Sequence, residues 1–314
     1  MTTAWVFPGQ GSQAVGMGRD VVERFAAAQA VFDEADQVLG FALSELCFVG
    51  PAAELTRTEN AQPALLTTSM ALLAAAREYA AAEHLPGPSY VAGHSLGEYS
   101  ALVAAGALSF ADALCLVRRR GELMAAATEG TMAAIMGLDV STLHAICSEA
   151  SDAGSVVVAN ENSPGQLVIS GTLAGVERAM ALAKARGAKR ALPLNVSAAF
   201  HSPLMAEAAR GLEVAVAEVE QVSVPKMPVI SNVTADPLVE PQAIRAELVA
   251  QVTAPVRWIA SVERMAADGV THVVEIGPGN VLAGLIKRIA PGMALLNVND
   301  AASVVRWVEQ SIQG

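Results

Sequence analysis

A serine at position 95 stands in a setting that exposes a nucleophile. Tyr90 and Val91 are strand formers, glycines stand two residues on either side of Ser95, and an alanine- and leucine-rich helical run follows. A serine in a sharp strand-to-helix turn adopts strained backbone angles that neighbouring glycines permit, and its hydroxyl is then exposed. The turn also leaves the Leu96 amide unpaired at a helix start, where it can stabilise an oxyanion. The spacing indicates nucleophilic chemistry, with a plain strand-to-helix turn as the alternative.

A serine nucleophile needs a base, and the predicted elements sort the five histidines. His94 is adjacent to Ser95 and is expected to point away from it. His201 lies where a predicted strand ends and a helix starts, so as a loop residue it can reach into a cleft. We expect His201 to be the base, with its imidazole oriented by a backbone carbonyl because no carboxylate stands out. Structural roles are expected for the remaining three, His84, His144 and His272.

An arginine on an apolar helix face is the second chemical signal. Val117, Arg120 and Met124 recur at helical spacing, so Arg120 lies on the apolar stripe while Arg119 points elsewhere. A guanidinium cannot lose its charge and needs an anionic partner in apolar surroundings. The partner is either an internal carboxylate or a substrate carboxylate held by two hydrogen bonds.

Two loops carry weaker signals. Gln10 lies in the loop after the first predicted strand and could donate a second hydrogen bond to an oxyanion. The turn Gly277–Gly279 precedes a predicted helix. This turn either cradles a phosphate or is only a tight connection.

Composition excludes several function classes. The 314 residues carry a net charge of −11, which argues against general nucleic-acid binding. The longest uncharged stretch is too polar to span a membrane, and no basic signal region precedes the first strand. The three cysteines are far apart without metal-ligand spacing, which favours free thiols in a cytoplasmic protein. One dense basic cluster is either a solvated helix end or a docking surface for an acidic partner: Lys184, Arg186, Lys189 and Arg190.

Strand and helix patterns alternate along most of the chain, which predicts an α/β fold with a mainly parallel sheet. Between residues 131 and 196 the order becomes β-α-β-β-α-β, the split βαβ of a ferredoxin-like module. We expect a large domain of residues 1–130 and 197–314, an inserted small domain of residues 131–196, and a ligand cleft between them. The predicted helices cover residues 21–39, 62–82, 110–127, 140–150, 173–186, 203–220, 241–252, 256–268 and 281–289.

These motifs together resemble the malonyl-CoA:acyl carrier protein transacylases of fatty-acid synthesis and the related acyltransferase domains of polyketide synthases. The resemblance covers nearly the whole chain, with several motifs in the family's order. It implies a hydrolase-like large domain with a ferredoxin-like insert. The motifs are Phe7–Gln13, Gln62–Ala64, Gly93–Ala101, Arg120–Gly121 with Met124, Asn160–Gln166, Phe200–Ser202 and Glu275–Gly279.

The resemblance also implies a role for each matching residue. Ser95 would be the acylated nucleophile and His201 its base, with Gln10 and the Leu96 amide as the oxyanion hole. The main-chain carbonyl of Gln251 would orient the histidine. The substrate-binding residues would be Arg120 opposite the malonyl carboxylate, together with Met124, Asn162 and Phe200. Ala198 stands where the polyketide signature usually has histidine, so the preference for malonyl over substituted malonyl groups is open.

The implied reaction is a ping-pong transfer on one serine. Malonyl-CoA acylates the serine, and the phosphopantetheine thiol of an acyl carrier protein takes the malonyl group. No permanently bound cofactor or metal is implied, and a monomer is expected. Three alternatives share parts of the pattern: a serine esterase or thioesterase, a transacylase subunit of malonate decarboxylase, and a non-catalytic scaffold.

Overall fold

The computed structural model describes residues 2–81, 85–196 and 198–313 and contains two sheets. The larger one has six strands in the order β10-β9-β1-β2-β7-β8, and all neighbours are parallel except β7 and β8. This is the mainly parallel sheet expected from the sequence. Its strands are β1 (Thr3–Phe7), β2 (Tyr90–Gly93), β7 (Val229–Ile230), β8 (Pro237–Leu238), β9 (His272–Ile276) and β10 (Ala294–Val298).

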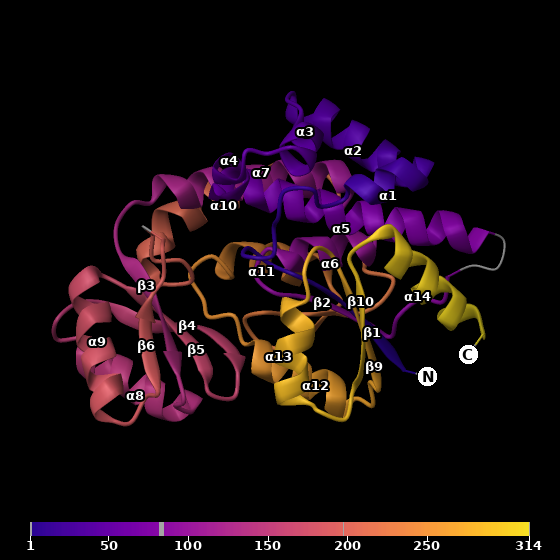
Figure 1. The fold of residues 1–314 in the computed structure, drawn as a ribbon. Helices are drawn as coiled ribbons and strands as arrows, with labels where there is room; N and C mark the ends of the chain where they lie inside the picture. The colour runs from indigo at the N-terminus through magenta and orange to yellow at the C-terminus, as the bar shows by residue number, and fades with distance from the viewer. Residues whose placement is uncertain (1, 82–84, 197, 314) are drawn as a thin grey trace.

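The large sheet is buried on both faces. Successive side chains of a strand point to opposite sides, so each strand contributes to the core on both faces. In β1, Trp5 and Phe7 join one apolar cluster, whereas Ala4 and Val6 join another. Helices α2 (Ala26–Leu39), α5 (Thr58–Ala80) and α7 (Phe110–Ala126) contribute to the first cluster. Helices α12 (Trp258–Ala267) and α13 (Val281–Ile289) contribute to the second, and Figure 1 shows the two groups on opposite sides of the strands.

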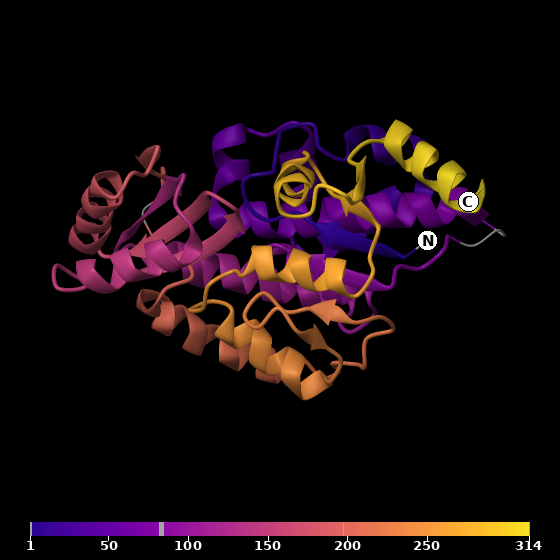
Figure 2. The same ribbon diagram turned by 90° about the horizontal axis from the view of Figure 1, so that it is seen from below.

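The second sheet is antiparallel, has the strand order β4-β5-β3-β6 and is covered by two helices. The chain order β3-α8-β4-β5-α9-β6 is the ferredoxin-like arrangement expected for this stretch. Both ribbon views place these elements beside the large sheet, at the left of Figures 1 and 2. They are β3 (Thr131–Met136), α8 (Val140–Ala150), β4 (Val156–Ser163), β5 (Gln166–Gly171), α9 (Leu173–Ala185) and β6 (Arg190–Pro193).

Backbone hydrogen bonds join strand β4 of the second sheet to a segment that lies outside both sheets. The Glu161 amide donates to the Val256 carbonyl at 2.9 Å, and the Val256 amide donates to the Ala159 carbonyl at 2.9 Å. Strand β4 is therefore fixed against the segment that precedes α12. The remaining helices are α1 (Arg19–Arg24), α3 (Leu43–Phe48), α4 (Ala52–Thr56), α6 (Gly97–Ala104), a 3₁₀ turn (Pro203–Met205), α10 (Ala206–Glu218), α11 (Pro241–Ala250) and α14 (Ala301–Gln313).

Several predicted boundaries were wrong. The helix predicted over residues 21–39 is two helices, because Phe25 is extended (φ −126°, ψ 119°) and ends α1. The helix predicted from residue 62 starts at Thr58, so Pro63 lies inside α5. A proline leaves the carbonyl four residues earlier without its helical donor. That carbonyl belongs to Glu59, and it accepts a hydrogen bond from Arg118 at 3.0 Å.

In the described parts of the chain, no helix is long and apolar enough to cross a membrane. The same residues contain no group of three or more His, Cys, Asp or Glu side chains that could hold a metal ion.

Candidate active site

Ser95 lies in a tight turn between β2 and α6. It has a left-handed backbone (φ 51°), a strained conformation for a residue other than glycine. A Cβ at Gly93 would lie 1.9 Å from the Gly97 carbonyl carbon, and a Cβ at Gly97 would lie 2.0 Å from the Phe7 carbonyl oxygen. Neither overlap is sterically possible, so both positions require glycine. The turn is the nucleophile-exposing type predicted from the sequence.

His201 faces the serine from the loop after β6. Its Nε2 lies 2.8 Å from Ser95 Oγ, and its Nδ1 lies 2.9 Å from the Gln251 carbonyl oxygen and 3.2 Å from that of Ala254. Nδ1 therefore carries the proton, and Nε2 accepts from the serine hydroxyl. Burial, with the nearby Arg120 charge, lowers the pKa of His201 to about 3. The imidazole is neutral at pH 7 and able to take a proton.

Two main-chain amides beside Ser95 are candidates for holding an oxyanion. The Leu96 N–H, at the start of α6, has no acceptor among the described residues. The Gln10 side chain donates instead to Thr58 Oγ1 at 3.2 Å, so its amide group is engaged away from the serine. The Gln10 main-chain N–H has no acceptor within the described ranges. Its loop lies against the serine turn, since a Cβ at Gly9 would be 2.4 Å from the His94 carbonyl oxygen.

Arg120 reaches the serine from α7 and is 2% exposed. Its Nη1 donates to Gln62 Oε1 at 2.8 Å, and its Nη2 donates to Gln251 Oε1 at 2.9 Å and Ser95 Oγ at 3.1 Å. None of the ion pairs found in the described residues includes this guanidinium, and its Nε has no hydrogen-bond partner there. Burial lowers the pKa of Arg120. Of the two partners considered from the sequence, the internal salt bridge is not formed.

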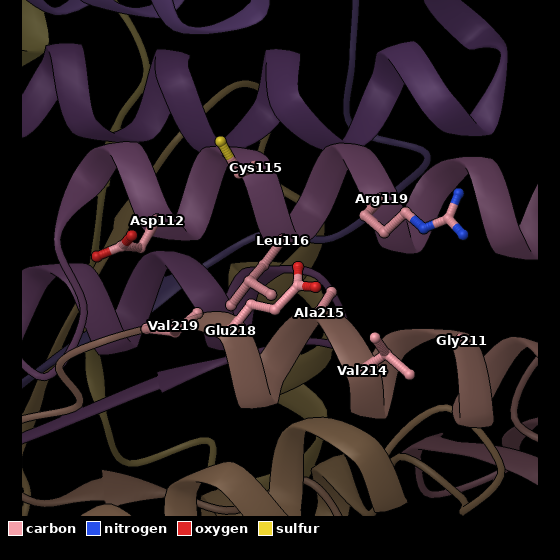
Figure 3. A pocket seen from close by; sticks show the side chains of 9 residues that line it. All are labelled: Asp112, Cys115, Leu116, Arg119, Gly211, Val214, Ala215, Glu218 and Val219. Carbon is pink, nitrogen blue, oxygen red and sulfur yellow. The ribbon is translucent and has the colours of Figure 1, made fainter.

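Arg119 points elsewhere, as its helical position predicts. It forms a salt bridge with Glu122 at 3.6 Å. Figure 3 shows Arg119 at a groove between α7 and α10, opposite Val214 and Glu218. Ser95 does not line this groove. The adjacent residues Arg119 and Arg120 of α7 therefore lie in different surroundings, Arg119 at the surface and Arg120 beside Ser95.

The other predicted substrate-binding residues are Met124, Asn162 and Phe200, and each has different neighbours in the structure. Met124 is buried, and its sulfur accepts from Gln62 Nε2 at 3.6 Å, so it belongs to the wall around Arg120. Asn162 Oδ1 is 2.7 Å from His94 Nε2. This contact holds His94 toward β4 and away from the serine hydroxyl. Phe200 is half-buried between the large-sheet core and a small cluster formed by residues of β3, β4 and β5.

Asn232 and Glu98 were missed as site residues by the sequence analysis. Asn232 Oδ1 accepts from the Ser95 amide at 2.7 Å, and Glu98 Oε1 accepts from the Asn232 amide at 2.8 Å. Both side chains are buried. Glu98 follows the serine by three residues, but Asn232 is brought beside it only by the pairing of β2 with β7. The available signal for Asn232 was its place as a polar residue at the carboxyl end of the strand predicted over residues 229–232.

The turn Gly277–Gly279 is a tight connection and not a phosphate cradle. The Glu275 carboxylate accepts from the Leu282 and Ala283 amides at 3.0 and 2.8 Å. These are donors of the first turn of α13, where an anion would bind. The site is therefore filled by the chain's own carboxylate.

The basic cluster is exposed at the end of α9 and the start of β6. Arg186 forms a salt bridge with Glu149, so its charge is partly compensated. Lys184, Lys189 and Arg190 take part in none of the salt bridges of the described chain. The two remaining histidines that the structure describes have partners other than Ser95. His144 pairs with Glu161 at 3.3 Å, and His272 bonds to Thr271. His84 lies outside the described residues.

Comparison with known proteins places this site in a family. A sequence profile described as the acyl transferase domain matches residues 4–309. A malonyl CoA-acyl carrier protein transacylase from Bacillus subtilis is 50% identical over 305 residues, which cover 96% of this chain and 94% of that protein.

Solved structures agree with the sequence match. An acyl-carrier-protein S-malonyltransferase from Burkholderia pseudomallei is 47% identical with a TM-score of 0.93, covering 98% of this chain and 100% of that one. A malonyl-transacylase solved in complex with its type II polyketide synthase acyl carrier protein is 43% identical with a TM-score of 0.94, covering 99% of this chain and 100% of that one. The chain therefore belongs to the malonyl-CoA:acyl carrier protein transacylase family of acyl transferases.

Proposed function

We propose that this protein transfers a malonyl group from malonyl-CoA to the phosphopantetheine thiol of an acyl carrier protein, through an ester on Ser95. The observation that carries the proposal is the buried Arg120 guanidinium, which lies 3.1 Å from Ser95 Oγ and has no carboxylate partner among the described residues. A buried cation without an anion favours an anionic ligand. A malonyl thioester supplies a carboxylate close to the carbonyl that the serine attacks.

In the first half-reaction, Ser95 Oγ attacks the thioester carbonyl carbon while His201 Nε2 takes the hydroxyl proton. The Gln251 carbonyl, 2.9 Å from Nδ1, holds the imidazole in this orientation and stabilises its charged form. The Leu96 amide and the Gln10 main-chain amide stabilise the oxyanion. The carbon–sulfur bond breaks, and the CoA sulfur takes the proton from His201.

In the second half-reaction, the phosphopantetheine thiol gives its proton to His201 and attacks the Ser95 ester. Ser95 Oγ leaves and recovers the proton, which restores the free enzyme. Arg120 holds the malonyl carboxylate through both halves, with Met124, Phe200 and Asn162 forming the surrounding walls. The charge-assisted pair favours dicarboxylic acyl groups over acetyl.

The experiment that tests this function offers malonyl-CoA with and without an acyl carrier protein that bears its phosphopantetheine arm. Malonyl-carrier protein should form by mass spectrometry, and carrier protein without the arm should stay unmodified. A serine esterase or thioesterase would release free malonate at the same rate in both mixtures. Carrier proteins of fatty-acid, polyketide and malonate-decarboxylase systems, compared side by side, identify the physiological class.

The basic cluster of Lys184, Arg186, Lys189 and Arg190 is the proposed docking surface for the carrier protein. With a net charge of −11, attraction to an acidic partner requires a local basic face. The exposed side chains at this end of α9 provide one.

We also propose the location, the oligomeric state and the domain division of the protein. The protein acts as a cytoplasmic monomer without a permanently bound cofactor or metal. Its chain divides into a large domain of residues 1–130 and 197–314 and a small domain of residues 131–196. The separate apolar clusters of the two sheets support this division.

A further inference from the structure

A buried carboxyl group lies directly behind the serine turn. Glu98, in the first turn of α6, is 0% exposed. Its Oε1 accepts from the Asn232 main-chain amide at 2.8 Å and from Asn232 Nδ2 at 3.1 Å, and its Oε2 accepts from Gln251 Nε2. Glu98 touches none of the atoms that react, yet both of its partners contact the peptide units of Ser95.

Asn232 holds the amide side of the serine. Its Oδ1 accepts from the Ser95 N–H at 2.7 Å, and its Nδ2 donates to the Gly93 carbonyl at 2.7 Å. Because Nδ2 also donates to Glu98, the side-chain amide can face the serine only with its oxygen. Glu98 thereby keeps an acceptor in front of the strained Ser95 backbone.

Gln251 holds the carbonyl side of the serine and connects it to the rest of the site. Its Nε2 donates to the Ser95 carbonyl at 3.0 Å and to Glu98, while its Oε1 accepts from Arg120 Nη2 at 2.9 Å. Its main-chain carbonyl accepts from His201. One residue therefore contacts the serine, the histidine and the arginine, and the orientation of its side-chain amide decides whether Arg120 meets an acceptor or a donor.

We propose that Glu98 is a positioning residue for the transfer reaction: by accepting from Gln251 Nε2 and from Asn232, it fixes the orientation of both side-chain amides, and so sets Ser95 and Arg120. The inference rests on the proposed function for its malonyl readout. Burial, together with the neighbouring carboxyl group of Glu247, raises the pKa of Glu98 well above the usual range.

Glutamine at position 98 separates positioning from packing. It has the shape of glutamate, its oxygen can still accept from Asn232, and its NH₂ group can donate to Glu247. That NH₂ cannot accept from Gln251 Nε2, so this one link is broken. Gln251 then loses one of the contacts that orient its side-chain amide, and only its hydrogen bonds to the Ser95 carbonyl and to Arg120 still hold it.

The matched control is Glu247→Gln. It makes the same charge change in the same buried pair. The substituted side chain can donate to Glu98 while its oxygen still accepts from the Val233 amide, which Glu247 now accepts at 3.0 Å. No hydrogen bond of Glu247 reaches Ser95, His201 or Arg120 among the described residues. This variant changes the carboxyl pair and leaves the Gln251 link in place.

The test measures, by rapid-quench mass spectrometry, the rate of Ser95 acylation by malonyl-CoA and by acetyl-CoA, with thermal unfolding of each variant. Glu98→Gln should acylate about 10- to 100-fold more slowly with malonyl-CoA, as expected for a displaced nucleophile. The loss should be smaller with acetyl-CoA, because only the malonyl group also uses Arg120. Glu247→Gln should acylate at close to the wild-type rate with both donors.

Equal losses in the two variants, or a wild-type rate in Glu98→Gln, would overturn the proposal. If Glu98→Gln does not fold, Glu98→Asp is measured instead. Its shorter carboxyl no longer reaches Gln251, so slowed acylation supports the role and an unchanged rate refutes it. Hydrolysis of p-nitrophenyl acetate by the same variants reports the placement of Ser95 without malonyl-CoA, so failure of the proposed function is told apart from failure of the Glu98 role.

Discussion

We propose that Arg120 distinguishes this serine site from a general esterase site. The guanidinium has only neutral hydrogen-bond acceptors and lies beside the nucleophile. Removing one partner of a desolvated charge pair costs about 3–5 kcal/mol. Its contribution should therefore be visible as a difference between acyl donors.

Arg120→Ala should lower kcat/KM for malonyl-CoA by roughly two to three decades, since about 1.4 kcal/mol corresponds to tenfold. Acetyl transfer should be unchanged or faster, because acetyl has no carboxylate to leave unpaired. Arg120→Lys should rescue only partly, because an ammonium lacks the planar fork. The measurement is steady-state kinetics with both donors. An equal loss for malonyl and acetyl transfer would make Arg120 a structural residue.

The lowered pKa of His201 predicts how the acylation rate depends on pH. Its pKa is lowered to about 3, first by burial and then by the Arg120 charge. Wild-type acylation by acetyl-CoA should therefore not lose its base between about pH 5 and 8. Arg120→Ala removes a positive charge and admits water, and both changes raise the pKa of His201. The acid limb of its pH–rate profile should lie at higher pH, and superimposable profiles would contradict the assignment.

The same lowered pKa affects stability. Below the ordinary value of 6.5 the unfolded chain binds a proton at His201 that the folded site excludes until about pH 3. Through this residue, the free energy of unfolding decreases as the pH falls through that range.

At the scale of elements, the serine turn depends on backbone approaches that only glycine permits. A Cβ at Gly97 would lie 2.0 Å from the Phe7 carbonyl oxygen, so Gly97→Ala forces the loop after β1 away from α6. We expect this variant to lose more than about 3 kcal/mol of unfolding free energy, above the usual cost of overpacking. Chemical denaturation measures the change.

The matched control is Gly284→Ala. Gly284 is exposed inside α13 and a Cβ there meets nothing within 4 Å. Alanine should stabilise this helix by about 0.5–1 kcal/mol. Similar effects of the two substitutions would show that the approach at Gly97 does not limit the fold.

Local signals explain which elements and residues were predictable. The Ser95 turn and the position of Arg120 on its helix depend on residues that are close together in the sequence. The strand, turn and helical spacing patterns therefore predicted them. The start of α5 at Thr58 was not predictable in this way, because the tolerance of Pro63 inside the helix depends on a hydrogen bond from Arg118 of another helix. Strand β10 and helix α14 were left out of the prediction, although both belong to the large-sheet core.

A site residue was predictable where the residues next to it in the sequence indicated its role. His201 was found from its loop between modules. Asn232 and the side-chain role of Gln251 could not be found in this way, because their hydrogen bonds to Ser95 span 137 and 156 residues of chain. The hydrogen bonds of Glu98 were hidden for the same reason.

The net charge of the whole molecule is −11, so an acidic carrier protein would be attracted only through a local basic surface. Lys184→Glu with Lys189→Glu should raise the KM for carrier protein and leave acylation by malonyl-CoA nearly unchanged. Reversing two exposed cations outside the cluster, Lys226→Glu with Arg306→Glu, makes the same change in net charge and is the control. Equal effects of the two double variants, or equal effects on both half-reactions, would argue against docking at the cluster.

The acyl-enzyme on Ser95 is measured by the intact mass of the protein after mixing with malonyl-CoA, followed by peptide mapping. We expect one malonyl ester on Ser95, which is lost when holo acyl carrier protein is added and is absent in Ser95→Ala. Ser95 meets both His201 and Arg120 through its hydroxyl, so no other side chain should carry the group. An adduct on one of the three cysteines, or no adduct on the wild-type protein, would contradict this expectation.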